Sequence, residues 1–301
     1  MAKLSIVDSK AIDWLRFPLI YLVVVIHSAL FYDKLIPIHW DAMTGQDYYQ
    51  LLVIFFSRSG AQIAVPTFFV ISGYLFFFKV NEWSKKVYVE KLKSRIHTLL
   101  IPYLLWIIIY IVLTGGYLFF KAWIGRIEWE DVSEWYNNNN GLLGMFWLSN
   151  EWGWDRLNLS GFPTPMGGPI AGPLWYIRNL MVLVILTPLI YIAIKRLKKW
   201  WLFFLAALYL GGVYLYIPGL RETDLLFFSI GAYLGVNKLS FTVLYKYRFI
   251  LYPMSIALWI LYAIAGGYDT ILGRSIDPFY VLSGTLSIIC IALQIVGGGT
   301  C

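Results

Sequence analysis

Eight segments of this chain are long and apolar enough to cross a lipid bilayer, and this feature constrains the fold most. They cover residues 14–31, 51–78, 99–120, 173–194, 200–217, 222–236, 249–265 and 279–296. A crossing helix needs about 20 apolar residues. Lipid cannot hydrogen-bond exposed backbone N–H and C=O groups, so each segment should be helical. The sequence therefore predicts an all-α fold, a polytopic integral membrane bundle with about eight transmembrane helices.

The composition excludes a soluble globular chain. Hydrophobic residues make up 59% of the sequence and charged residues only 14%, whereas a soluble domain is about a quarter charged. The formal net charge is +7, but the basic residues lie between apolar segments, where they set topology rather than bind nucleic acid. The two cysteines, Cys290 and Cys301, form no metal-ligand pattern, so neither a disulfide nor a metal is expected.

The distribution of charge predicts the orientation. If the N-terminus is cytoplasmic and the spans alternate, the cytoplasmic connections hold 16 of the 24 Lys and Arg residues. They hold only four of the 17 Asp and Glu residues. This bias follows the positive-inside rule. We therefore expect a multi-pass plasma membrane protein with a cytoplasmic N-terminus.

One outer connection is long enough to have a function of its own. We read residues 1–301 as a single transmembrane domain with a long outer loop at 121–172. Long loops are often lids or binding surfaces. One interpretation is a site where indole rings stack on sugars, and the other is an aromatic belt at the membrane surface. The tryptophans concerned are Trp123, Trp129, Trp135, Trp147, Trp152 and Trp154.

Two ionisable residues share a face of the first segment. Arg16 and His27 are 11 positions apart, which is about three helical turns and roughly 16 Å along the axis. A guanidinium can bind an anion, and a neutral imidazole in a dry environment can act as general base. An ionisable group within a span indicates function. The alternatives are a topology-setting arginine and a buried histidine bonded to another helix.

The second segment contains small and polar residues near its end. Ser72 and Gly73 allow helices to approach closely. Alternatively, the Ser72 hydroxyl and the backbone line a narrow channel with Tyr74 at its edge. Gly60 and Pro66 interrupt the same segment, which predicts a bend.

Two further sites with basic residues follow the second apolar segment. The stretch 85–95, which includes Lys93 and Arg95, can hold phosphates or act only as the positive-inside signal. The fourth segment opens with Trp175 and carries Arg178 within its apolar run. A guanidinium there needs an anionic or polar partner. The candidates at similar depth are Glu222, Asp224 and Asp277.

These motifs together resemble those of the membrane-bound acyltransferase family 3, which includes O-acetyltransferases of bacterial surface polysaccharides. The resemblance rests on four features in this order: the Arg16-to-His27 spacing, Val65-Pro-Thr-Phe-Phe-Val-Ile-Ser-Gly-Tyr-Leu, Arg95 followed by Ile101-Pro-Tyr, and Leu174-Trp-Tyr-Ile-Arg. It covers the chain from about Ile12 to the last apolar segment. The family commonly has about ten spans, more than the eight read here, so we expect the C-terminus to be truncated.

The resemblance assigns roles to residues by position. His27 corresponds to the family's essential histidine, and Arg16 to its paired arginine. Arg95 matches the first arginine of an Arg-x-x-Arg motif whose second position is Thr98 here, a departure from the family pattern. The catalytic candidates are therefore His27 and Arg16. Candidates for holding the cofactor are Arg16, Ser72, Tyr74, Lys93 and Arg95, and those for the acceptor are Trp175 and Arg178.

The function implied is O-acyl transfer, most simply O-acetyl transfer. Cytoplasmic acetyl-CoA or another acyl-CoA is the donor substrate, with no tightly bound cofactor. The acceptor is a hydroxyl of a lipid-linked or cell-surface glycan, and the location is the bacterial inner membrane. His27 either removes the hydroxyl proton or carries the acyl group itself. The rival hypothesis is a transporter or flippase of a lipid-linked oligosaccharide, and a membrane sensor is a third.

The orientation gives the first testable prediction. Single cysteines introduced at 85–93 or 195–199 should resist a membrane-impermeant maleimide in intact cells, because both stretches are expected to be cytoplasmic. A cysteine introduced at 137–140 should react. Permeabilised cells provide the control, since all three should then be labelled. External labelling of both basic stretches would reverse the orientation.

Overall fold

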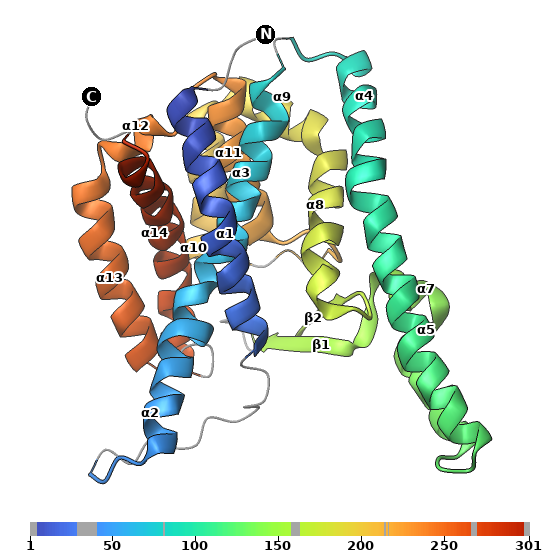
Figure 1. Ribbon diagram of the computed structural model, residues 1–301. Coiled ribbons are helices and arrows are strands. Elements are labelled where there is room, and N and C mark those ends of the chain that lie inside the picture. Colours follow the sequence, from blue (N-terminus) through green and yellow to red (C-terminus); the bar gives the residue numbers. More distant parts are fainter. Residues whose placement is uncertain are drawn as a thin grey trace. The chain divides into compact units, whose positions relative to one another are not determined.

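The computed structural model describes residues 5–28, 41–80, 82–157, 163–213, 215, 217–265 and 270–297, with the side chains of 150–166 left out. Helices dominate this part of the chain (Figure 1). The chain divides into two compact units. The first contains Met1–Asn81, Leu197–Leu210 and Leu226–Cys301, and the second contains Glu82–Arg196 and Gly211–Leu225.

The first unit is built around α1. Its helices are α1 (Ile6–Ser28), α2 (Gly45–Leu52), the π-helix η2 (Val53–Ser59), the 3-10 helix η3 (Gly60–Ile63), α3 (Ala64–Phe78), α10 (Lys199–Leu210), most of α11 (Glu222–Val236), α12 (Thr242–Tyr245), α13 (Arg248–Ile264) and α14 (Ile271–Ile295). In α1 the residues Ala11, Leu15 and Leu19 are buried, at the spacing that forms one helical face. This face packs against α3 and α14.

Glycines bring α3 and α11 into backbone contact. A Cβ atom on Gly73 would lie 2.1 Å from the carbonyl oxygen of Phe228, and one on Gly231 would lie 1.8 Å from that of Val70. A Cβ atom on Gly235, one turn beyond Gly231, would lie 2.7 Å from the carbonyl oxygen of Tyr74. Helices associate in lipid mainly through packing, which small residues permit. The packing interpretation of Gly73 is therefore confirmed.

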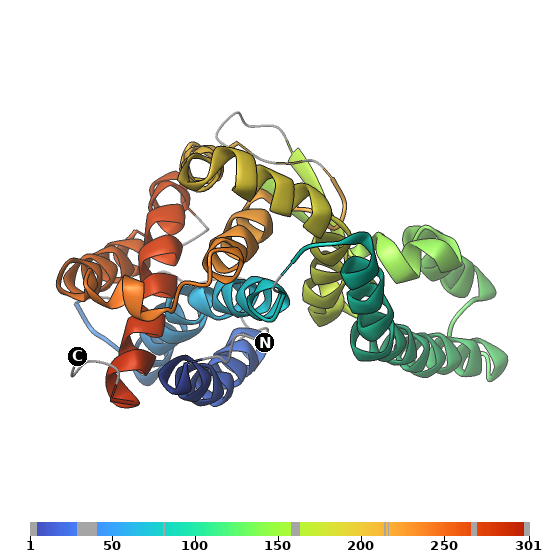
Figure 2. The same ribbon diagram turned by 90° about the horizontal axis from the view of Figure 1, so that it is seen from above.

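The second unit is organised by one long helix. Its elements are α4 (Lys85–Arg95), the π-helix η4 (Ile96–Leu100), α5 (Ile101–Trp123), α6 (Trp129–Asn138), α7 (Gly141–Trp147), β1 (Ser149–Leu157), β2 (Pro163–Gly168), the 3-10 helix η5 (Gly172–Leu174), α8 (Trp175–Ile185) and α9 (Thr187–Leu197). Figure 2 shows α6 and α7 beside α5 within this unit. One buried cluster of its core contains Tyr103, Ile107, Met145, Ile170 and Ala171.

The connection 121–172 has regular structure of its own. It contains α6, α7 and an antiparallel hairpin in which Ser149 pairs with Gly168 and Asp155 with Pro165. In the residues that the structure describes, the fold is therefore all-α apart from this hairpin, which the sequence did not predict. Trp135 packs against the core of the second unit. The side chains of Trp152 and Trp154 lie outside the described residues.

The predicted count of about eight spans is wrong for the described residues. Three helices there are long and apolar enough to cross a membrane by length and composition, namely Gly45–Phe78, Lys85–Trp123 and Ile271–Ile295. A fourth is added if Gly172–Ile185 and Thr187–Leu197, which are bent by 60°, form one span. These helices still indicate a membrane protein.

Helix length explains most of the difference. Each of the eight segments contains helix, but α10, α11 and α13 have only 12, 15 and 17 residues. At about 1.5 Å per residue these helices are roughly 18, 22 and 26 Å long, short of a hydrocarbon core about 30 Å thick. Hydropathy marks apolar stretches but does not show where the helix within each one ends.

The crowding at Gly231 predicts a large loss of stability on substitution. In Gly231→Ala the new methyl would overlap the Val70 carbonyl, so α3 and α11 must separate. Overpacking typically costs about 1–3 kcal/mol, which should lower the melting temperature in detergent. Gly116→Ala in α5 is the matched control, because nothing lies within 4 Å of its new Cβ. Equal melting temperatures for the two variants would contradict the close contact.

Candidate functional site

Arg16 and His27 lie on one continuous helix. Both fall within α1, which is unbroken from Ile6 to Ser28 (Figure 1). The helical geometry from which their shared face was predicted is therefore present. His27 is half-buried in the last turn, whereas Arg16 is exposed. Among the described residues, α1 packs against η2, η3, α3 and α14.

Arg16 makes one weak ion pair on its own helix. Its Nη1 lies 3.1 Å from Oδ1 of Asp13, and the two side chains are 64% and 60% exposed. Exposed pairs of this kind contribute little to stability. A guanidinium has five donors, so Arg16 keeps donors for an anionic ligand.

Tyr74 is part of the core. It is fully buried, and its hydroxyl donates to Oδ2 of Asp8 over 2.9 Å. The other carboxylate oxygen of Asp8 accepts from the Ser240 hydroxyl and the Phe241 N–H at 2.8 and 3.1 Å. Tyr74 thus ties α3 to the start of α1, and this contact occupies its polar atom. The neighbouring Ser72 is half-buried.

The basic candidates Lys93 and Arg95 belong to the second unit. Both lie near the end of α4, Lys93 exposed and Arg95 half-buried. Thr98 donates to the carbonyl of Ser94 in the preceding turn, at 3.2 Å. The cofactor candidates are therefore divided between the two units.

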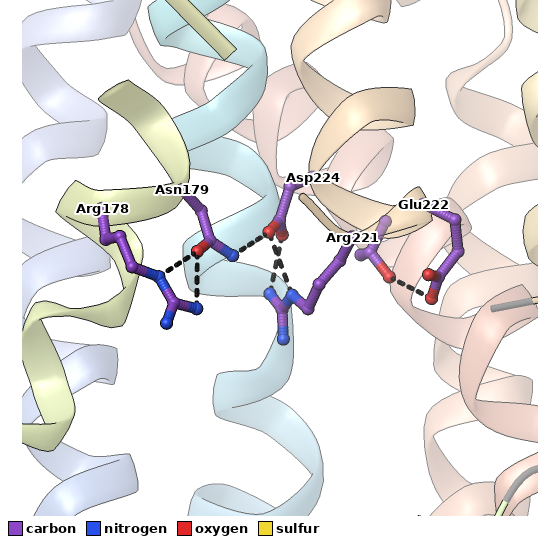
Figure 3. A network of polar contacts seen from close by, with 6 residues as sticks. Arg178, Asn179, Arg221, Glu222 and Asp224 are labelled. Carbon is purple, nitrogen blue, oxygen red and sulfur yellow. Dashed lines mark hydrogen bonds and ion pairs between the residues drawn. The ribbon is translucent and has the colours of Figure 1, made fainter. Parts of the chain in front are cut away.

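Arg178 is the centre of a buried polar network in the second unit (Figure 3). Its Nε and Nη2 both donate to Oδ1 of Asn179, at 3.1 and 3.0 Å. Nη1 donates to the carbonyls of Trp147 and Gly167. Arg178 therefore joins α8 to the end of α7 and to β2. It is only 5% exposed, and Asn179 is fully buried.

The network continues through Asn179 to an ion pair. The Asn179 amide donates to Oδ2 of Asp224 over 2.6 Å. Asp224 also accepts from both Nε and Nη2 of Arg221, at 2.9 and 2.6 Å. The Arg221 guanidinium lies 4.0 Å above the ring of Trp175, within cation–π range. One buried carboxylate thus holds two arginines in place, one directly and one through an amide.

The predicted need of Arg178 for a polar partner is confirmed, but none of the three acidic candidates accepts a hydrogen bond from it directly. Asp224 belongs to the network, but the contact passes through Asn179. Glu222 instead accepts from the Leu215 N–H at 3.2 Å, and Asp277 belongs to the other unit. Asn179 was not singled out in the sequence, although a buried amide next to Arg178 in an apolar run was the available signal.

Arg221 was also missed, because it lies in a connection rather than in an apolar segment. There its charge looks like an ordinary topology signal. Its side chain is 19% exposed, so it combines a fixed position with some access. Among the described residues, no group of three His, Cys, Asp or Glu residues is placed to hold a metal ion.

Comparison with protein families supports an enzymatic role. The model of an acyltransferase domain matches residues 9–298, nearly the whole chain. The chain belongs to acyltransferase family 3. The match includes both units and every candidate residue named above. A search of curated proteins and a search of solved structures gave no significant match.

The family assignment confirms the resemblance drawn from the sequence motifs. The protein is an acyltransferase of a membrane family. The roles of His27, Arg16 and the other candidates stay predictions. The structure shows the surroundings of these residues. On α1, Arg16 is exposed and His27 is half-buried, and Arg178 lies within a buried polar network.

The network predicts that Asp224 is essential for stability. In Asp224→Asn the side chain keeps its shape but leaves two buried or partly buried arginines without their carboxylate. Removing one partner of a buried ion pair costs about 3–5 kcal/mol, so the melting temperature of the purified acyltransferase should fall sharply.

Asp13→Asn is the matched control, because it removes the exposed partner of Arg16. Its effect on stability should stay within about 1 kcal/mol. Similar melting temperatures for Asp224→Asn and Asp13→Asn would show that the buried pair does not hold the second unit together.

Proposed function

We propose that this acyltransferase moves an acyl group, in the simplest case acetyl, from acyl-CoA to a hydroxyl of a lipid-linked or cell-surface glycan. The observation that carries the proposal is the pair Arg16 and His27 on one continuous helix of a family 3 acyltransferase. About 16 Å separate the two positions along the axis. An extended thioester donor can span that distance, with its anionic part at Arg16 and its acyl group near His27.

The donor side is proposed to face the cytoplasm, in line with the charge bias of the connections. The N-terminus is cytoplasmic in this scheme, and the membrane is the bacterial inner membrane. The phosphates of CoA are anions that a guanidinium binds through two hydrogen bonds at once. Arg16 supplies such a group in the first unit, and Lys93 and Arg95 of the second unit are separate candidates for the same role. Ser72 and Tyr74 lie on α3, which packs against α1.

His27 supplies the proton chemistry. The acceptor hydroxyl attacks the thioester carbonyl, a C–O bond forms and the C–S bond to CoA breaks. His27 takes the hydroxyl proton and passes it to the departing thiolate. In the second form of the mechanism, the imidazole first accepts the acyl group and then transfers it to the hydroxyl. Both forms require a neutral ring, which a poorly hydrated environment favours.

The acceptor side is proposed to involve Trp175 and Arg221, while Arg178 bonds Asn179, which donates to the same carboxylate of Asp224 that holds Arg221. The Trp175 ring and the Arg221 guanidinium form a stacked pair, and Asp224 fixes the guanidinium. Aromatic faces suit sugar rings, and arginine donors suit their hydroxyl or acidic groups. Support for this role comes from the rigidity of the network and from the partial exposure of Arg221.

Substitution of His27 tests the catalytic part of the proposal. A general base contributes about 10² to 10⁴ in rate, so His27→Gln should lower CoA release from acetyl-CoA by about that factor. Thermal stability should change little, because the ring is only half-buried. His97→Gln is a matched control, since His97 is exposed in η4 and has no role in the scheme.

The outcomes separate the hypotheses. A folded His27→Gln protein with normal CoA release would remove His27 from the mechanism. Lost stability with normal rate per folded molecule would make His27 a structural residue. A flippase or transporter would consume no thioester, so the unmodified protein would then release no CoA at all.

A further inference from the structure

An irregular segment lies between α2 and α3 in the first unit. Residues 53–59 form the π-helix η2, and residues 60–63 form the 3-10 helix η3. The sequence predicted an interruption at Gly60 and Pro66, but the departure from α-helix begins earlier, at Val53. π-Helical turns are energetically unfavourable and occur frequently at functional sites. A run of this length therefore requires support from its surroundings.

Side chains of two other helices supply that support. The indole Nε1 of Trp259 in α13 donates to the carbonyl of Phe55 at 2.9 Å. The hydroxyl of Tyr280 in α14 donates to the carbonyl of Gly60 at 3.2 Å. Gly60 itself has no room for a side chain, because a Cβ there would lie 2.9 Å from the Phe55 oxygen. The irregular turns are thus held from outside the segment.

The same segment is bonded to the end of α1. The hydroxyl of Ser57, in the π-helix, donates to the carbonyl of Val25 at 2.8 Å. Val25 is two positions before His27 on the same helix. Ser57 is only 5% exposed, so water competes weakly for this bond. The hydrogen bond fixes the backbone from which the His27 side chain extends.

We propose that Ser57 is a positioning residue for His27, and that the π-helix exists to bring its hydroxyl to the last turn of α1. This inference rests on the proposed function of His27. Ser57 touches neither donor nor acceptor and acts through the Val25 carbonyl. Trp259 acts one step further out, by holding the π-helical turn that carries Ser57.

The test compares two buried serines in the full-length protein. Ser57→Ala removes the bond between η2 and α1. Ser255→Ala is the control, because the Ser255 hydroxyl donates to the Tyr252 carbonyl within its own helix and so links no other described helix. The readout is CoA release from acetyl-CoA, with kcat and KM measured separately alongside the melting temperature. Misplacing a catalytic group by about 1 Å can cost about a hundredfold in rate.

We expect kcat of Ser57→Ala to fall by about tenfold to a hundredfold, with KM for acetyl-CoA unchanged. Ser255→Ala should keep the normal kcat. A normal kcat for folded Ser57→Ala, or a change confined to KM, would overturn the proposal. If Ser57→Ala does not fold, Trp259→Phe decides, since it keeps a ring but loses the donor to Phe55. The kcat of Trp259→Phe should then fall while its KM stays constant. A normal kcat for Trp259→Phe would overturn the proposal.

A double variant separates this inference from the proposed function. Adding Ser57→Ala to His27→Gln should cause no further loss, because the two residues then act on one step. An additional loss would place Ser57 in another role. A fully active His27→Gln protein would instead refute the proposed function, whereas an inactive His27→Gln with an active Ser57→Ala would refute only the positioning role.

Discussion

Backbone carbonyls at the interruptions of helices are the constraint on which much of this structure depends. A carbonyl that is buried away from water must find a partner within the protein. The chain meets this need with polar side chains aimed at carbonyls. Lys238 donates to Phe77, Phe78 and Val80 at the end of α3. Arg178 does the same at the end of α7 and in β2. Polar residues in apolar surroundings therefore have a structural role here, as hydrogen-bond donors to backbone carbonyls. Their presence alone does not indicate catalysis.

Glycine contact and carbonyl capping operate on the same helix. Gly73, Gly231 and Gly235 allow α3 to touch α11 along its backbone, and Lys238 follows α11 directly. Lys238 adopts a left-handed backbone conformation with φ of 56°, which prevents the helix from continuing beyond α11. Its ammonium group lies at the end of α3. The close packing of α3 against α11 and the capping of the α3 carbonyls by Lys238 therefore depend on each other. A change that separates the two helices also takes the ammonium away from the carbonyls.

The sequence predicted the helical class, the approach at Gly73, and the need of Arg178 for a polar partner. Each follows from a local rule: apolar length, a missing side chain, or a charge in an apolar run. Other features depend on contacts distant in sequence. Asn179 meets Asp224 across 45 positions. The π-helix is held by Trp259 of α13, and the 3-10 helix that follows it is held by Tyr280 of α14. The predicted number of spans is wrong for a related reason, because the ends of helices are set by packing and capping as well as by hydropathy.

Arg178 and Arg221, both in the second unit, differ in whether their guanidinium donors remain accessible to a ligand. The donors of Arg178 bond Asn179, Trp147 and Gly167, so a ligand could bind it only by breaking those bonds. Arg221 directs one edge to Asp224 and lies over Trp175, and it retains some exposure. A fixed, partly open guanidinium is better prepared to recognise a ligand than a closed one. The sequence pointed to Arg178, whereas the partial exposure of Arg221 is the reason that the proposed acceptor contact is assigned to Arg221.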